Sequence, residues 1–257
     1  MRSRMSGSDL KVIVAAHKPY WMPRDPCYVP IQVGSAGKET IMGFQRDDEG
    51  DNISSRNPNY CELTGLYWAW KHLDADYLGL THYRRHFASK SSGEKRGRVA
   101  TGEQLMDALR KTPIVLPKLR NYYIETNYSQ YVHAHHVKDL ETTRDILATT
   151  APAYLNKYDE VMKRTYGHRF NMFIMRRDLA NAWCEWLFGV VFELEKQLDI
   201  SKYSQNDARV FGFVSERLID VWVEVNGLPA LDMPIVNLEN QHWAKKGVSF
   251  IARKVRA

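Results

Sequence analysis

Cysteine is scarce in this sequence. Its three cysteines, Cys27, Cys61 and Cys184, are far apart, and none belongs to a C-x-x-C pair. Such a set supplies neither a disulfide framework nor a cysteine-rich metal site, which favours a reducing compartment. Long apolar runs are also missing: none reaches the roughly 18 residues of a membrane-spanning helix, and the run after the basic N-terminus is too short for a signal-peptide core. We therefore expect a cytoplasmic protein, at most peripheral on the inner face of the cell membrane.

Several common catalytic signatures are absent as well. The sequence has no G-x-x-x-x-G-K-[ST] loop, no G-x-G-x-x-G turn, no H-E-x-x-H helix and no G-x-S-x-G elbow. ATPases, dinucleotide enzymes, zinc proteases and serine hydrolases of those types are therefore poor fits. The segment "YVHAHHVKD" contains His133, His135 and His136. However, the adjacent pair should point in different directions on any regular element, whereas metal ligands must converge, so we predict no metal site there.

Apolar runs alternate with helical patterns along the chain. The apolar runs predict strands at 11–17, 28–34, 76–85, 113–120 and 170–177. Helical spacing and capping signals predict helices at 57–73, 102–111, 137–165 (as two helices), 178–198 and 206–226. This alternation indicates an α/β fold, with a mainly parallel central sheet flanked by helices. We expect a single domain over residues 11–240, between a flexible N-terminus (1–10) and a basic tail (241–257).

Four of the predicted strands end in basic side chains. The clusters are His17 with Lys18; His82, Tyr83, Arg84 and Arg85; Lys118 with Arg120; and Arg176 with Arg177. If these strands are parallel, their carboxyl ends meet at one edge of the sheet, where ligands bind in such folds. Positive charge focused at that edge would attract a polyanion. Four such ends favour an anion site over ordinary solvated strand ends.

The polyanion left by these exclusions is a nucleotide sugar. Many sugar transferases hold its diphosphate with a metal bound by a D-x-D motif, and "DAD" occurs at residues 74–76. That motif precedes its strand, so it should lie at the opposite edge of the sheet from the basic ends. Arginine can bind phosphate oxygens in bidentate geometry without a metal. We therefore predict that no divalent metal is required and that the donor is bound by His17, Lys18, His82, Tyr83, Arg84 and Arg85. The two arginines would stabilise the leaving diphosphate, and His82 and Tyr83 would touch the donor or brace the arginines.

The tail at 241–257 carries most of the excess charge. Its five Lys and Arg residues, with no acid, account for +5 of the formal net charge of +6. They alternate with large apolar residues such as Trp243 and Phe250, a composition that suits an anionic membrane surface. A solvated, frayed terminus is the alternative.

Blocks of the sequence resemble one known family. They include "AHKPYWMP", "RDDEGDNISSRNPNYCELTGLYWAWKH", "DYLGLTHYRRHF", "LPKLRNYYIET", "NMFIMRRDLANAWCEWLF" and "RVFGFVSERLIDVW". Together, over residues 11–238, they resemble a domain family of bacterial capsular and exopolysaccharide clusters that is associated with glycosyltransferases. The resemblance implies a GT-A-like fold. It also implies transfer of galactose or galactofuranose from a UDP-sugar to a growing surface polysaccharide or lipid-linked glycan.

Further site residues follow from the resemblance and from spacing. Following the resemblance, Asp47, Asp48 and Asn52 contact the donor; the alternatives are a cation site and a solvated acidic turn. Asn171 occupies a place where related transferases contact the acceptor or donor sugar. Glu62 shares a helical face with Gly65 and Ala69, which suits either close ligand approach or tight packing with Glu62 paired to an arginine. We count Glu62, Asn171, His135 and His136 as candidate acceptor or sugar contacts.

The catalytic base should be a carboxylate near the sugar. Asp207 and Glu216 are nine residues apart and therefore lie on opposite faces of a helix, so both cannot point into one cleft. We favour Glu216, which falls in the stronger family block, over Asp207; the alternative for Glu216 is a salt bridge to an arginine.

Two other functions compete with a transferase. One is a non-catalytic sugar-binding partner of another transferase. The other is a nucleic-acid-binding protein, which the sequence pI of about 9.1 allows. We disfavour nucleic acid because the excess charge lies almost wholly in the tail. The expected partners are the UDP-sugar, the glycan or lipid-linked acceptor, and an anionic membrane surface through the tail, with a homo-oligomer as a further option.

Overall fold

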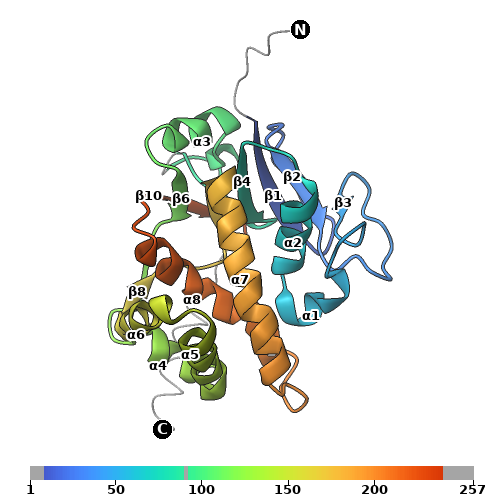
Figure 1. The fold of residues 1–257 in the computed structure, drawn as a ribbon. Coiled ribbons are helices and arrows are strands. Elements are labelled where there is room, and N and C mark those ends of the chain that lie inside the picture. Colours follow the sequence, from blue (N-terminus) through green and yellow to red (C-terminus); the bar gives the residue numbers. More distant parts are fainter. Residues whose placement is uncertain (1–8, 90–91, 240–257) are drawn as a thin grey trace, which may run out of the picture.

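The structure is a computed structural model that describes residues 9–89 and 92–239 (Figure 1). The basic tail at 241–257 and most of the N-terminal segment therefore lie outside the described residues. In the described part of the chain, no helix is both long and apolar enough to cross a bilayer.

The described residues form one large sheet and one small one. The large sheet contains β1 (Leu10–Ala16), β2 (Tyr28–Gln32), β3 (Gln45–Arg46), β4 (Tyr77–His82), β5 (Arg85–Phe87), β6 (Ile114–Pro117), β9 (Phe173–Arg176), β10 (Ala230–Met233) and β11 (Ile235–Asn237). The small sheet pairs β7 (Arg120–Asn121) with β8 (Tyr166–Gly167). The order along the main path is β10-β6-β9-β4-β1-β2-β3, and β5 and β11 extend from the end of β4.

Strand direction decides which strand ends meet. β1, β2, β3 and β4 are parallel, whereas β9 is antiparallel to both β4 and β6. β6 and β10 therefore run in the same direction as β4. The prediction of a mainly parallel α/β sheet is confirmed, but the prediction that four basic strand ends converge is wrong for the fourth. Arg176 pairs with Tyr77 at the start of β4, so Arg176 and Arg177 lie at the opposite edge of the sheet from Arg84 and Arg85.

Helices cover the sheet. They are α1 (Asn57–Tyr60), α2 (Leu63–His72), α3 (Gly102–Leu109), α4 (Asn127–Val132), α5 (Val137–Thr150), α6 (Leu155–Lys163), α7 (Arg177–Gln197) and α8 (Val210–Val225). Single 3-10 turns lie at Ser54–Arg56, Arg96–Arg98, Pro152–Tyr154 and Asp207–Arg209. The long α7 crosses the sheet, with α2 on one side of it and α8 on the other (Figure 1).

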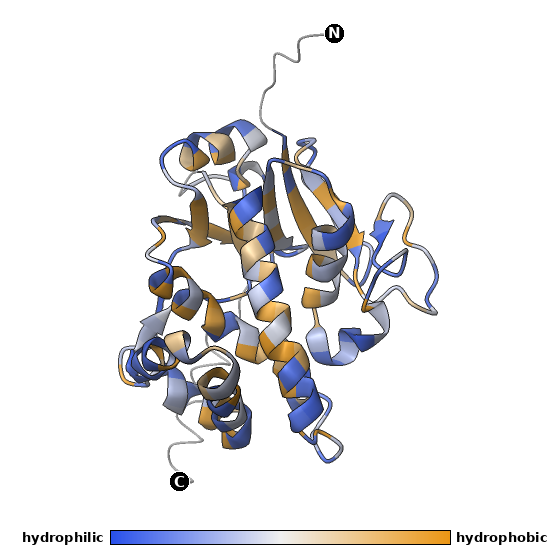
Figure 2. Cartoon of the chain, viewed as in Figure 1, coloured by the Kyte–Doolittle hydropathy of each residue, from blue (hydrophilic) through white to orange (hydrophobic). Residues whose placement is uncertain are grey.

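Successive side chains of β1 point to opposite faces of the sheet, and both faces are buried. Val12 and Val14 pack with Leu105 and Leu109 of α3, whereas Ile13 belongs to the larger core built with α2, α7 and α8. Two buried faces produce the continuous apolar run at 12–16, as expected for a parallel strand. Figure 2 shows apolar residues concentrated on these central strands.

The helix predicted at 57–73 is two helices. Cys61 separates α1 from α2 with φ 54° and ψ −130°, a backbone conformation that a helix interior does not adopt. The Asn57 side chain accommodates the break by donating to the Cys61 carbonyl oxygen at 2.7 Å. Gly65 lies on the packed face of α2, where a Cβ atom would stand 2.7 Å from Val33 Cγ1. This contact supports the packing interpretation of Gly65. It leaves Glu62, which precedes α2, beside the open end of the sheet.

Candidate active site

A cavity of about 630 Å³ opens at the carboxyl ends of β1 and β4. Three walls enclose it: the two strand ends, the α1–α2 junction and the first turns of α8. The lining residues are Ala15, His17, Lys18, Val33, His82, Tyr83, Arg84 and Arg85 from the sheet edge; Asn57, Pro58, Cys61 and Glu62 from the junction; and Gln205, Ala208, Arg209, Gly212, Phe213 and Glu216 from the α8 wall. Eight of the side chains predicted as site residues therefore come together here.

The arginines at the end of β4 are held differently. Arg85 is half-buried, its Nε donates to Asn237 Oδ1 at 3.0 Å, and its guanidinium lies 3.8 Å from the centre of the Phe170 ring. Burial lowers the pKa of Arg85, but a guanidinium stays charged in proteins. Arg84 is more exposed and forms an ion pair with Glu239 at 3.3 Å. Arg85 is thus the more fixed cation, and the remaining N–H groups of its fork have no protein acceptor among the described residues.

Tyr83 braces the basic wall. Its side chain is buried, with Lys18 Nζ at 5.5 Å and the Arg84 guanidinium at 5.6 Å from its ring centre. The His17 ring meets it edge-on at 5.3 Å. Burial, followed by the charges of Lys18 and Arg84, lowers the pKa of His17. The aromatic ring thus positions cations that would otherwise be free to move.

His82 is fixed by a backbone carbonyl. Its Nε2 lies 2.5 Å from the carbonyl oxygen of Phe170, so Nε2 carries the proton and donates. Burial lowers the pKa of His82, and the neighbouring Glu62 carboxylate opposes that shift. A neutral ring with its proton on Nε2 leaves Nδ1 as an acceptor. His82 and Tyr83 therefore both line the cavity and hold other parts of its wall.

Glu216 supplies an unpartnered carboxylate. It is half-buried on α8 and lines the cavity, and within the described part of the chain its carboxylate accepts no hydrogen bond and forms no ion pair. Burial raises the pKa of Glu216, and Glu62 adds to this shift while Arg217 opposes it. A carboxylate with a raised pKa at a cavity has the properties of a general base or acid.

Glu62 is held by a buried network behind the cavity. Asn171 Nδ2 donates to Glu62 Oε1 at 2.6 Å and to the Gly212 carbonyl oxygen at 3.0 Å. Ser215 Oγ in turn donates to Asn171 Oδ1 at 2.8 Å. Asn171 and its neighbour Phe170 have φ values of 54° and 77°, a conformation that is unfavourable for side chains other than Gly and Asn. Asn171 is buried behind the wall, so it orients Glu62 and does not line the cavity.

Arg209 and Cys61 complete the wall opposite the sheet. Arg209 Nε donates to Cys61 Sγ at 3.2 Å, and the guanidinium lies 4.9 Å from the centre of the Phe213 ring. Burial raises the pKa of Cys61 to about 11, with Glu62 contributing, so the sulfur is a thiol at neutral pH. Neither residue was among the predicted site residues. Helical spacing could have found Arg209, because it precedes Phe213 and Glu216 by four and seven residues on one helix face.

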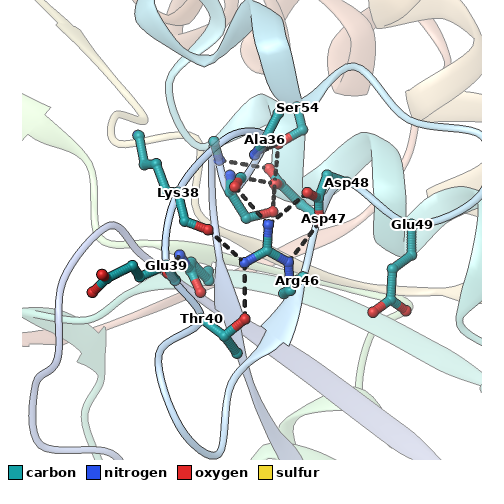
Figure 3. A network of polar contacts seen from close by, with 12 residues as sticks. Ala36, Lys38, Glu39, Thr40, Arg46, Asp47, Asp48, Glu49 and Ser54 are labelled. Carbon is teal, nitrogen blue, oxygen red and sulfur yellow. Dashed lines mark hydrogen bonds and ion pairs between the residues drawn. The ribbon is translucent and has the colours of Figure 1, made fainter.

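The acidic loop does not line the cavity. Figure 3 shows the network of polar contacts around Arg46, Asp47 and Asp48. Asp47 is fully buried, and both carboxylate oxygens accept hydrogen bonds. The donors are Gly34 N (2.8 Å), Ser35 N (3.0 Å), Ser35 Oγ (2.8 Å), Ser54 Oγ (2.5 Å) and Thr64 Oγ1 (2.6 Å). Asp48 is occupied by Arg46, which donates to both of its oxygens at 2.9 and 2.6 Å.

Asn52 is occupied too, because its Nδ2 donates to the carbonyl oxygens of Asp48 and Gly50. The structure therefore does not bring Asp47, Asp48 or Asn52 to the cavity. Their polar groups are used to fold the loop that precedes α1.

His135, His136 and Asp207 form a separate cluster beside the cavity. His135 Nδ1 lies 3.0 Å and His136 Nε2 3.7 Å from the Asp207 carboxylate. The prediction that the adjacent histidines diverge is wrong, because they occupy an irregular bend between α4 and α5. Hydrogen bonds from Ser204 and His135 lower the pKa of Asp207, which makes it a weak base. Of the two carboxylates, Glu216 on α8 lines the cavity, whereas Asp207, in the 3-10 turn before α8, does not.

The D-x-D motif is distant from the cavity. Its Asp76 precedes β4 and accepts a hydrogen bond from Asp9 N at 2.8 Å, at the edge where β4 begins. In the described ranges, no group of three or more His, Cys, Asp and Glu side chains is arranged to hold a metal ion. The motif therefore does not fit a donor-binding metal at this cavity, and metal dependence stays a prediction.

The fold and the cavity define an α/β protein with a cation-lined site at the carboxyl edge of its sheet. The chain belongs to the family described as Domain of unknown function (DUF4422), whose model matches residues 11–227. It is also similar to a solved apo structure of WbbM, described as a bifunctional glycosyltransferase, with a TM-score of 0.82 and 28% identity. That match covers 91% of this chain and 46% of the WbbM chain, so this chain spans about half of the larger protein. Among curated proteins, none matches the chain significantly.

Proposed function

We propose that the chain is a glycosyltransferase that moves a hexose from a UDP-sugar to a growing surface polysaccharide or lipid-linked glycan. One observation carries the proposal: the unpartnered Glu216 carboxylate and the cations at the strand ends line the same cavity. The likeness to a bifunctional glycosyltransferase supports it. The family resemblance favours galactose or galactofuranose as the sugar and a GT-A-like fold. It also favours a place at the inner face of the membrane.

The donor diphosphate binds at the basic wall in this proposal. Arg85, Lys18 and Arg84 approach from the sheet edge, and Arg209 approaches from α8. Arginine forks are suited to bidentate contacts with phosphate oxygens. Because Arg84 is shared with Glu239, we assign the main phosphate contact to Arg85 and a secondary one to Arg84.

The reacting end of the donor then faces α8. In the proposed step, Glu216 takes the proton from an acceptor hydroxyl, whose oxygen forms a bond to the anomeric carbon of the sugar. The bond from that carbon to the diphosphate oxygen breaks, and UDP leaves with its added negative charge next to Arg85 and Arg84. Glu62, oriented by Asn171, binds a sugar hydroxyl through its free oxygen. His135 and His136 lie farther out, where Phe213 separates His135 from the cavity.

Fixed cations take the place of a metal in this scheme. The support is the donor set itself, since the basic wall presents guanidinium, ammonium and imidazole groups, none of which is a good Mg²⁺ ligand at the diphosphate position. The D-x-D motif lies at the other edge of the sheet. We therefore propose that UDP binds without a divalent cation.

Thermal unfolding with UDP, GDP and their sugars tests donor binding directly. A ligand at about a hundredfold excess over its dissociation constant stabilises the folded state by roughly 2.7 kcal/mol. We expect a shift with UDP that EDTA does not remove, and transfer from a UDP-hexose to a lipid-linked acceptor. Absence of both UDP binding and transfer would refute the proposed function. A strict Mn²⁺ requirement for the shift would refute only its metal-free part.

A further inference from the structure

Exposed apolar side chains gather at one corner of the molecule. Among the described residues, eight large apolar side chains are exposed, and five of them belong to this corner: Leu119, Tyr123, Ile124, Tyr128 and Tyr166. Of these five, the two at the tip are the most exposed, with Tyr123 at 82% and Ile124 at 74%. The corner is formed by the turn that joins β7 to α4, together with β8, which lies near α4 and α6 (Figure 1). Such a cluster marks an interaction surface.

The tip is held in its exposed position. Tyr123 has φ 61°, an unfavourable conformation for an aromatic residue. Its N–H donates to Asn121 Oδ1 at 2.7 Å, and Ile124 N–H donates to the Tyr122 carbonyl oxygen at 2.7 Å. These bonds keep two apolar side chains in solvent at the end of a tight turn. A strained backbone that presents apolar groups to water requires a reason other than packing.

The corner is anchored to the cavity wall. Tyr122 N–H donates to the Thr165 carbonyl oxygen at 2.7 Å, and the Tyr122 hydroxyl accepts from Arg169 Nε at 3.0 Å. Arg169 is buried and directly precedes Phe170, which holds His82 and packs on Arg85. Hydrogen bonds therefore join the corner to the segment that carries Phe170, which contacts His82 and Arg85 of the cavity wall.

Cations without carboxylate partners surround the apolar tip. Lys118, Arg120 and Lys163 are exposed, and within the described residues none of them forms an ion pair. Three acidic neighbours are paired within the described residues: Glu125 with His133, Asp232 with His168 and Asp159 with Arg144. Glu141 lies beside Tyr128 and Lys163 and is the acid of this corner that forms no ion pair there. Aromatic and aliphatic side chains ringed by free Lys and Arg match the interface of an anionic bilayer, where aromatic rings sit at the headgroup level and cations meet lipid charge.

We propose that this corner, defined by Leu119, Tyr123, Ile124, Tyr128 and Tyr166 with Lys118, Arg120 and Lys163, docks on the surface of an anionic lipid bilayer. Tyr123 and Ile124 enter the headgroup region, and the three cations contact lipid phosphates. This docking is independent of the sugar chemistry and of the tail at 241–257.

Co-sedimentation of the full chain with vesicles tests the proposal. We expect binding to phosphatidylcholine vesicles that contain 30% phosphatidylglycerol, a composition chosen to carry negative charge, and weak binding to pure phosphatidylcholine. The double substitution Tyr123→Ser with Ile124→Ser should weaken partitioning at least about tenfold, because two apolar side chains lose their lipid contact. Lys118→Gln with Arg120→Gln should weaken it about fivefold per cation, and only on anionic vesicles.

Met42→Ser is the matched control. Met42 is 94% exposed and precedes β3, which lies on the other side of the molecule from β8 (Figure 1), so its loss should not change partitioning. Thermal unfolding and the UDP-induced shift, measured without vesicles, should be the same in all these variants. Unchanged partitioning of the Tyr123/Ile124 variant would overturn the proposal. So would a change in oligomeric state by light scattering with vesicle binding intact, since the corner would then be an interface between copies. Vesicle docking without UDP binding and without sugar transfer would refute the proposed function and leave this proposal standing.

Discussion

Two regions of the molecule use carboxylates in opposite ways. In the loop before α1, Asp47 is fully buried and accepts five hydrogen bonds. In the cavity, Glu216 is half-buried and has no hydrogen-bond or ion-pair partner among the described residues. Both residues are acids in motifs that the sequence singles out. The difference teaches that the unsatisfied carboxylate, and not the most acidic stretch, marks the site.

The contrast has a physical basis. A carboxylate that accepts several hydrogen bonds is stabilised as an anion and has no lone pair left for a substrate proton. A half-buried carboxylate without partners is raised in free energy as an anion, and its pKa rises accordingly. We therefore expect Glu216 to exchange a proton with a substrate, whereas Asp47 holds backbone amides and hydroxyls in place.

Glu216→Gln should produce the largest effect on activity. The amide keeps the shape of the side chain but cannot take a proton, so we expect the transfer rate to fall about 10²- to 10⁴-fold. The UDP-induced thermal shift should persist, because the proposed diphosphate contacts are made mainly by Arg85 and the other cations of the sheet edge. Steady-state kinetics with a UDP-hexose measure the loss. Full activity in this variant would show that Glu216 is not the base. The contrast between Glu216 and Asp47 would then not identify the catalytic residue.

Asp47→Ala should have the opposite effect: a loss of stability with little change in activity. The substitution leaves two backbone amides and three hydroxyl groups without their buried acceptor, so we expect a loss of about 3 kcal/mol or more in the free energy of unfolding. Urea denaturation measures it. Activity per folded molecule should stay close to that of the unaltered chain. Asp48→Asn serves as the control, since it removes only one partly exposed ion pair with Arg46, worth up to about 1 kcal/mol. If the Asp47→Ala protein folds but cannot bind UDP, the original prediction that this loop contacts the donor would be supported.

The sequence predicted the fold better than it predicted the site. Period and capping signals sufficed for the α/β class, because β1 and β4 are apolar runs buried on both faces. These signals do not give strand direction, because an apolar run such as 170–177 has the same pattern in a parallel and an antiparallel strand. The prediction therefore placed Arg176 and Arg177 at the wrong edge of the sheet. Only the register with Tyr77 reveals the reversal.

Local sequence patterns were sufficient to predict some of the cavity residues but not others. The cluster at 82–85 could be found because four polar residues end a buried strand. Cys61 could not, because a helical pattern continues through it and gives no sign of the positive φ that separates α1 from α2 there. The convergence of His135 and His136 on Asp207 was likewise hidden, since a bend and not a regular element presents them.

The two arginines at the end of β4 should differ by a smaller factor in their effect on UDP affinity. Arg85→Ala removes a charge-assisted contact from a half-buried, positioned guanidinium, so we expect UDP to bind about ten- to a hundredfold more weakly. Arg84→Ala removes an exposed cation that Glu239 already shares, and the loss should be at most about fivefold. Isothermal titration with UDP measures both constants. Equal losses of UDP affinity would show that the exposure and ion pairing of an arginine do not determine how much it contributes to UDP binding.

The smallest effect should be a dependence of stability on pH that lies outside both regions. His168 is held between Asp220 and Asp232, with its Nε2 at 2.9 Å from Asp232 Oδ1. Burial alone would lower the pKa of His168, but the hydrogen bonds and charges of the two carboxylates raise it above its ordinary value. The folded state therefore binds this proton more tightly than the unfolded chain does. The resulting stabilisation is fully present below the unfolded pKa of about 6.5 and is lost as pH rises through the folded value.

This dependence has the opposite sign to that expected for activity. The rate should rise with pH as Glu216 loses its proton, with the midpoint above the usual glutamate range because its pKa is raised. Urea denaturation as a function of pH should show stability declining above about pH 6.5, by less than the Asp47→Ala effect. His168→Gln should flatten that decline without moving the pH profile of the rate. If His168→Gln shifted the pH profile of the rate instead, the protonation of His168 would be coupled to the cavity. That coupling would run along α8, which carries both Asp220 and Glu216.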